Sequence, residues 1–180
     1  MHIKSQLREQ STGPDIEYLF APLKRARLDY MVQKATELGV SILRPVITRR
    51  TQAYRINLER MRANIIEAAE QCGILHIPEI AEPIKLESAL QTWQEGRALV
   101  FCDEEISVSS PLETLRKIKP GPVAVLIGPE GGFDDDERQA LSQQPSVHTI
   151  SLGPRVMRAD TAAVAALSLV NAVLGDWKPA

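Results

Sequence analysis

Short apolar runs alternate with amphipathic stretches along most of this chain, and that alternation limits the possible folds more than any other feature. The apolar runs predict strands over residues 16–20, 41–47, 98–102, 123–127 and 147–152. Apolar residues at helical spacing predict helices over residues 28–38, 57–73, 86–93, 111–118, 134–141 and 160–174. Strands that alternate with helices predict an α/β fold with a mainly parallel sheet and helices on both of its sides.

The chain divides into a short polar start and one domain. Residues 1–14 are polar, and we interpret them as a linker or as the remnant of a longer preceding unit. Residues 15–180 are enough for one domain with its own core. No apolar stretch approaches the ~20 residues of a membrane span, and the first residues do not resemble a signal peptide. We therefore expect a cytoplasmic protein.

Two glycine-bearing loops follow predicted strands near the end of the chain. The first runs from Leu126 to Gly132 and the second from Ser151 to Thr161. In parallel sheets small ligands bind at the edge where the strands end and the loops to the following helices begin. The two loops therefore predict one composite pocket. The first loop matches neither the dinucleotide fingerprint nor the phosphate-binding loop, and a simple tight turn is the alternative reading.

The second loop places an apolar pair between two arginines. Val156 and Met157 could form the wall of an adenine pocket, while Arg155 and Arg158 face an anionic partner. In the alternative reading the two arginines bind local carboxylates, such as Asp160 or Glu130. Asp160 is most simply the N-cap of the last helix. That helix is apolar nearly all round, so it is predicted either to lie deep in the monomer or to form half of a dimer interface.

Other polar residues give weaker signals. Glu70 and Gln71, at the end of the second helix, are candidates to orient a base edge, although solvent-facing polar residues explain them equally well. Cys72 and Cys102 are far apart and are predicted to be reduced, buried thiols. The histidines are equally scattered, so no metal site is expected.

The net charge of −2 hides an asymmetry along the chain. Residues 1–66 carry twelve Lys and Arg against six Asp and Glu, whereas residues 67–180 carry nine against seventeen. The planar fork of arginine binds phosphate well. The basic first third therefore favours a phosphate-bearing partner, although a solvated helix face with scattered ion pairs would give the same composition.

Four stretches together resemble one protein family. They are residues 33–40, residues 67–73 with the sequence Glu-Ala-Ala-Glu-Gln-Cys-Gly, residues 127–133 around Gly-Pro-Glu-Gly-Gly, and residues 152–162. In this order they are similar to the ribosomal small-subunit RNA methyltransferase E family, whose members methylate N3 of a uridine in 16S rRNA with S-adenosylmethionine. The resemblance covers residues 15–175 and implies a SPOUT-class α/β fold with a C-terminal trefoil knot, a topology that is otherwise very rare.

The resemblance also implies a homodimer, with 16S rRNA of the small ribosomal subunit as partner and without a metal or a membrane. It implies a cofactor site whose contacts are largely to the backbone. The residues that it assigns to S-adenosylmethionine are Ile127, Gly128, Glu130, Gly131, Gly132, Ser151, Leu152, Gly153, Val156, Met157 and Arg158.

Uridine N3 must lose a proton to attack a methyl group, so the reaction needs a proton acceptor and help for the developing anion. Arg158 or Arg155 is the predicted anion stabiliser, and Glu70 or Asp160 the predicted proton acceptor. The catalytic residues expected are therefore Arg158, Asp160 and Glu70. The RNA contacts expected are Arg25, Arg27, Arg49, Arg50, Arg155 and Gln71.

The chain departs from the family pattern in two places. Family members usually begin with an RNA-binding barrel similar to a PUA domain, and this chain starts after it. Ile74 stands where many members carry Arg. Two other functions stay open: another SPOUT methyltransferase that acts on tRNA or on a ribose 2′-oxygen, and a non-catalytic RNA-binding or assembly module.

Overall fold

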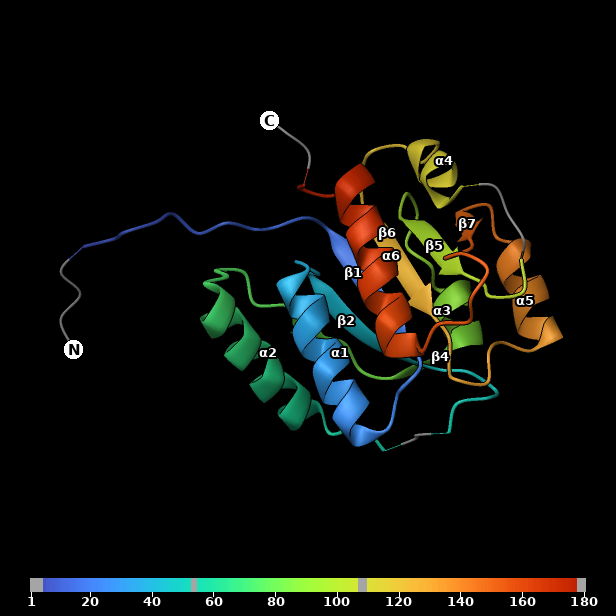
Figure 1. Ribbon diagram of the computed structural model, residues 1–180, viewed down its shortest axis with the longest axis horizontal. Helices are drawn as coiled ribbons and strands as arrows, with labels where there is room; N and C mark the ends of the chain where they lie inside the picture. The colour runs from blue at the N-terminus through green and yellow to red at the C-terminus, as the bar shows by residue number, and fades with distance from the viewer. Residues whose placement is uncertain (1–4, 53–54, 107–109, 178–180) are drawn as a thin grey trace.

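The predicted α/β fold is confirmed by a computed structural model that describes residues 5–52, 55–106 and 110–177. One sheet is covered by helices on both faces (Figure 1). The strands are β1 (Ile16–Phe20), β2 (Ile42–Ile47), β3 (Glu79–Ile80), β4 (Ile84–Lys85), β5 (Ala98–Cys102), β6 (Val123–Ile127) and β7 (Val147–Ile150). The helices are α1 (Arg25–Glu37), α2 (Leu58–Cys72), α3 (Leu86–Gln91), α4 (Pro111–Arg116), α5 (Asp135–Ser142) and α6 (Ala159–Val173).

The order of the strands decides which loops meet. The sheet runs β3-β2-β1-β6-β5-β7, β4 pairs with β2, and each of these pairings is parallel. β1 and β6 lie at the centre and are buried along their whole length, as expected for strands covered on both faces. Because the strands are parallel, the loops after β5, β6 and β7 emerge side by side at one edge.

Each face of the sheet has its own core. Helices α1, α2, α4 and α6 cover one face, where Met31, Ile65, Val125 and Leu167 are fully buried in one cluster. Helices α3 and α5 cover the other face around a second cluster that includes Leu126 and Phe133. The β6 side chains alternate between the two clusters, and this alternation anchors the start of the first glycine loop from both faces.

Local capping chemistry explains where α2 begins and ends. The Asn57 side chain accepts a hydrogen bond of 2.9 Å from the Arg60 N–H, and Gly73 ends the helix in the left-handed region with φ +63°. Both ends were predicted from residue type. Asp134 likewise caps α5 through a reciprocal capping box with Glu137.

The predicted start of the last helix is wrong. The N-cap of α6 is Arg158 and not Asp160, because Arg158 is the last residue with an extended backbone, at φ −65° and ψ 149°. Asp160 lies inside the first turn, where its Oδ1 accepts from the Thr161 N–H at 3.0 Å. An acid stabilises either position through the helix dipole, so the residue type alone did not distinguish them.

The burial predicted for two other features differs from the structure. Cys72 is exposed, since it lies in the last turn of α2, which faces solvent and also exposes Glu70 and Gln71. Cys102 is buried as expected. Helix α6 is buried on one face only, through Ala163, Leu167, Val170 and others. Its remaining apolar side chains are half-buried or, at Ala172, exposed, so α6 does not lie deep in the monomer.

Residues 5–14 form neither helix nor strand and run outside the sheet (Figure 1). The Gln10 side-chain amide donates to the Leu75 carbonyl, which ties the segment to the loop after α2. The domain boundary after residue 14 stays a prediction, and β1 begins at Ile16.

Candidate functional site

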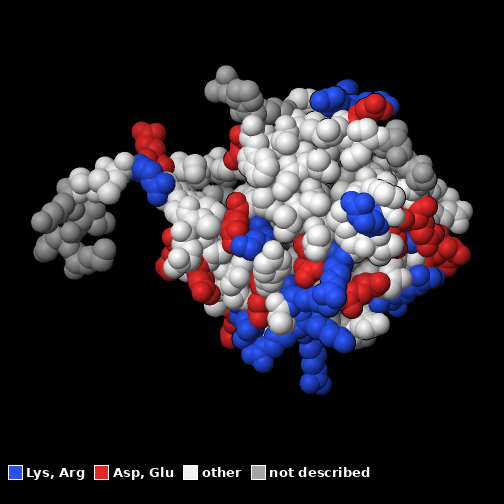
Figure 2. All heavy atoms as spheres, in the orientation of Figure 1, with Lys and Arg blue, Asp and Glu red and all other residues white. Residues whose placement is uncertain are grey.

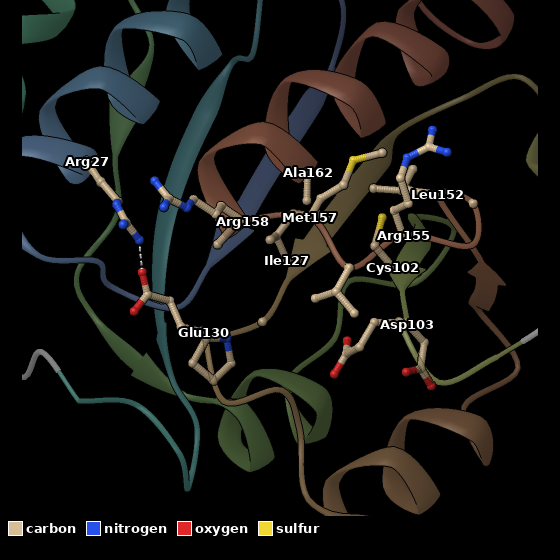
Figure 3. Close-up of a pocket in the computed structure, with 16 residues that line it drawn as sticks. Arg27, Cys102, Asp103, Ile127, Glu130, Leu152, Arg155, Met157, Arg158 and Ala162 are labelled. Carbon is tan, nitrogen blue, oxygen red and sulfur yellow. Dashed lines mark hydrogen bonds and ion pairs between the residues drawn. The ribbon is translucent and has the colours of Figure 1, made fainter.

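A cavity of about 390 Å³ opens where the loops after β5, β6 and β7 meet the first turn of α6 (Figure 3). Both glycine loops of the sequence contribute to it, together with a third loop after β5 and one residue of α1. The lining residues are Arg27, Cys102, Asp103, Glu104, Ile127, Gly128, Pro129, Glu130, Leu152, Gly153, Arg155, Val156, Met157, Arg158, Ala159 and Ala162. The size lies within the range of small-molecule sites.

Tight packing beneath the first glycine loop shapes one wall. A Cβ on Gly128 would lie only 2.4 Å from Cε2 of Phe133. Phe133 is itself buried and meets Phe101 edge-on, with ring centroids 5.0 Å apart. The Gly132 N–H closes the turn by donating to the Pro129 carbonyl at 2.9 Å, with φ +69° at Gly132. Position 128 therefore requires glycine, since the loop backbone packs directly on the Phe133 ring beneath the cavity wall.

The second glycine loop supplies an apolar wall. Leu152 and Met157 lie with Ile127 and Ala162 around the cavity (Figure 3). Gly153 adopts φ +108°, and its N–H donates to Ser151 Oγ at 3.3 Å. These apolar groups face the open volume and suit a flat apolar ligand surface such as a purine.

A third wall follows β5, and sequence reasoning missed it. Asp103 is only 4% exposed and pairs with Arg138, which also binds Glu104 at 3.0 Å and Glu105 at 3.1 Å. The available signal was positional: Asp103 directly follows a predicted parallel strand, so it belongs at the same edge as the glycine loops.

Cys102 lies in the floor of the cavity as a neutral thiol. Burial raises the pKa of the Cys102 thiol to about 12, so it stays protonated at physiological pH. A thiol in that state is a weak nucleophile. Cys102 therefore contributes apolar surface to the cavity rather than covalent chemistry.

The arginines at the cavity rim differ in their partners. Arg27, in the first turn of α1, forms an ion pair with Glu130 of the first glycine loop (Figure 3). Arg155 and Arg158 are exposed, and neither forms an ion pair with a carboxylate among residues 5–52, 55–106 and 110–177. Within the described chain, the reading in which these two arginines bind Asp160 or Glu130 is therefore wrong.

Other predicted RNA contacts lie near the same edge but are partly engaged within the chain. Arg49 pairs with Asp134 at 2.9 Å and with Asp136 at 2.5 Å, and these hydrogen bonds raise the pKa of its guanidinium. Arg50 donates to the Gly131 carbonyl at 2.9 Å and so braces the first glycine loop. Arg25 is exposed in the first turn of α1, and Figure 2 shows that lysines and arginines gather along this lower edge.

Two predicted site residues lie away from the cavity. Glu70 and Gln71 end α2, which leads into β3, so they lie at the amino edge of the parallel sheet. The cavity lies at the carboxyl edge, and the structure does not bring these two side chains to it within one chain. Four further predicted cofactor or catalytic residues do not line the cavity: Gly131, Ser151 and Asp160 directly adjoin residues that do, and Gly132 is two residues from Glu130.

The described residues contain no group of three or more His, Cys, Asp or Glu side chains placed to hold a metal ion. Across the same part of the chain, no helix combines the length and the apolar character that crossing a membrane requires.

Comparison with known proteins identifies the family to which this chain belongs. A family model described as an RNA methyltransferase domain matches residues 10–171. The Ribosomal RNA small subunit methyltransferase E of Rickettsia conorii is 31% identical over 172 residues, which cover 95% of this chain and 70% of the relative. The chain spans 62% of the length of three other curated relatives of the same name.

Two solved structures with a similar fold are likewise a methyltransferase and a tRNA modifying enzyme by name. The Ribosomal RNA small subunit methyltransferase E of Neisseria gonorrhoeae, solved bound to S-adenosyl methionine, superposes with a TM-score of 0.82 at 27% identity. The match covers 91% of this chain and 68% of that one. A TrmH/SpoU tRNA modifying enzyme of Aquifex aeolicus shares the fold at 13% identity, with a TM-score of 0.54 over 89% of this chain and 75% of that one.

Proposed function

Because this chain belongs to the RNA methyltransferase domain family, and within it to the ribosomal RNA small subunit methyltransferase E family, we propose that it methylates small-subunit rRNA with S-adenosylmethionine. The proposed reaction is methyl transfer to N3 of a uridine in 16S rRNA. The observation that carries the proposal is the cavity built by both glycine loops at the carboxyl edge of the sheet. The fold is of the SPOUT class, since its structural neighbours include SpoU methyltransferases.

The residues present fit the cofactor. Gly128 lines the cavity and packs directly on the Phe133 ring because it has no Cβ, and Leu152 and Met157 offer apolar surface to an adenine ring. When bound, S-adenosylmethionine supplies a methyl group activated by a sulfonium. The chain would hold the cofactor mainly through the backbone of residues 127–132 and 151–157.

Arg158 is the proposed anion stabiliser of the transfer. Its guanidinium is exposed at the rim and is not engaged by a described carboxylate. A positive group placed beforehand at the site of developing charge lowers the barrier without reorganisation. The other proposed groups are Asp160 as proton acceptor, next to the cavity-lining Ala159, and Arg25, Arg27, Arg50 and Arg155 as phosphate contacts.

Titration calorimetry of the purified 180-residue chain with S-adenosylmethionine tests the proposal. We expect one site per chain with a dissociation constant in the micromolar range, about 8 kcal/mol of binding free energy. ATP, which shares the adenosine but carries a triphosphate in place of the methionine, serves as the control ligand and should bind at least tenfold more weakly. Absence of heat with S-adenosylmethionine would reduce the assignment to shared ancestry of the fold.

We further propose that the chain forms a homodimer through α6. The face over α6 carries few charged side chains (Figure 2), and Val156 and Trp177 nearby in sequence are 84% and 54% exposed. Exposed apolar surface of this kind marks interaction sites. Sedimentation equilibrium should give twice the mass of 19.9 kDa, and the substitution Ala165→Glu on the half-buried side of α6 should return it to the monomer value. A monomeric unchanged chain at micromolar concentration contradicts this proposal.

The trefoil knot is a proposal of the same kind. After β7 at the sheet edge, the chain enters α6, which packs back against α1 and β6 near the sheet centre. A trefoil knot needs a C-terminal segment that turns back and passes through a preceding loop, and this return path meets the first of these two conditions. An experimental structure traced without breaks through residues 98–174 decides whether the backbone is knotted.

A further inference from the structure

The loop after β5 carries more negative charge than its surroundings neutralise. Asp103, Glu104 and Glu105 all pair with one guanidinium, that of Arg138. Among the described residues no second cation pairs with any of the three, so this cluster has an excess of two negative charges. Two members of the cluster, Asp103 and Glu104, line the cavity.

Asp103 is the buried member of this cluster. Its side chain is 3% exposed, against 37% for Glu104 and 63% for Glu105. Its Oδ1 accepts from Arg138 Nη1 and from the Glu105 N–H, the latter at 3.1 Å. Its Oδ2 accepts a hydrogen bond from none of the described residues. Among the described residues, the buried side-chain polar atoms without a hydrogen-bond partner are His76 Nε2 and Asn171 Oδ1. Asp103 Oδ2 is therefore accessible, and the opening that Asp103 lines is the cavity.

The position of Asp103 is rigid. Its N–H donates to the Ile150 carbonyl at 3.1 Å, which extends the β5–β7 pairing beyond the strand. Arg138 of α5 holds the carboxylate from the opposite direction, and its Nε also donates to the Phe133 carbonyl at 3.3 Å. One side chain thus ties the acidic loop to the first glycine loop. In Figure 3 Asp103 lies across the cavity from Arg27 and Arg158.

We propose that Asp103 is a cofactor-binding residue, whose free carboxylate oxygen accepts a hydrogen bond from a donor of S-adenosylmethionine. This assignment rests on the proposed function. The cofactor offers two kinds of donor, the ammonium of its methionine part and the hydroxyls of its ribose. Both satisfy Oδ2, and the excess negative charge of the loop complements the positive charge of the cofactor. Arg138 is the positioning residue that keeps the carboxylate at the cavity wall.

The test compares Asp103→Asn with Glu105→Gln in the full chain by titration calorimetry. Both variants remove one carboxylate charge from Arg138, but Glu105 does not line the cavity. Asp103→Asn should weaken S-adenosylmethionine binding about ten- to a hundredfold, as expected for a hydrogen bond to a charged group, whereas Glu105→Gln should change it less than threefold. Equal affinities of Asp103→Asn and the unchanged chain overturn the assignment.

A second ligand separates the two donors. 5′-Methylthioadenosine keeps the ribose but lacks the amino acid part of the cofactor. If Asp103→Asn weakens both ligands equally, the donor is a ribose hydroxyl; if it weakens only S-adenosylmethionine, the donor is the ammonium. Failure of the unchanged chain to bind S-adenosylmethionine overturns the proposed function and this assignment with it.

The unchanged chain provides a check that does not depend on folding of a variant. S-Adenosylhomocysteine can be compared with analogues that lack the ribose hydroxyls or the amino group. One of the two deletions should cost at least tenfold in affinity. Equal affinity of all three ligands overturns the assignment.

Discussion

The variant Arg158→Ala is expected to lose methyl transfer almost completely while it keeps its cofactor. Arg158 stands at the N-cap of α6 on the cavity rim, and no described carboxylate engages its guanidinium. A preorganised donor for developing negative charge contributes about 10²–10³ in rate. Transfer of labelled methyl groups from S-adenosylmethionine to small ribosomal subunits should fall by about this factor, and calorimetry should place the dissociation constant of the cofactor within a few-fold of the unchanged value.

Arg155→Ala is the matched control for this experiment. Arg155 is also exposed, also lines the cavity and also lacks a described ion pair, but it lies four residues before the first residue of α6. As a phosphate contact it should raise the KM for RNA and leave kcat nearly unchanged. Normal turnover by Arg158→Ala would remove Arg158 from the catalytic machinery. A raised KM for RNA with unchanged kcat in both variants would indicate that the two arginines act only in RNA binding.

The substitution Gly128→Ala is expected to damage both stability and cofactor binding. The new methyl group would lie 2.4 Å from Phe133, a fully buried ring that is packed against Phe101. Overpacking of this kind costs about 1–3 kcal/mol. Urea unfolding followed by circular dichroism should show that loss. Any part of the strain relieved by moving the loop should appear as weaker S-adenosylmethionine binding, about tenfold for each 1.4 kcal/mol.

Gly131→Ala, in the same loop, provides the contrast. A Cβ there would meet Arg50 at 3.6 Å, an ordinary van der Waals distance, and the φ of Gly131 is not positive. This variant should unfold within about 0.5 kcal/mol of the unchanged chain. If both variants behave alike, close packing under Gly128 does not shape the site.

Much of the fold was predictable because its signals are local. The strands β1, β5 and β6 have the predicted bounds. A short apolar run between polar segments, continuous in β5 and β6 and interrupted by Glu17 in β1, is typical of a buried strand in an α/β chain. The caps of α2 were equally clear, because Asn57 and Gly73 act on their own neighbouring backbone. The first turn of α6 was not predictable to the residue, because Asp160 and Thr161 both have side chains that suit an N-cap. Arg158, the actual N-cap, makes no side-chain cap hydrogen bond.

The sequence by itself determined the parallel sheet, the two glycine loops and the expectation that they share one edge. Only the tertiary structure decided which side chains lie across the cavity from the two glycine loops. The reason is that the strand order β1-β6-β5-β7 brings together segments far apart in the chain. That order puts Asp103, which pairs with Arg138, into the cavity wall and pairs Arg27 with Glu130 at the rim. It also leaves Glu70 at the opposite edge. Whether a charged residue is free or paired depends on such distant neighbours, and no local pattern records them.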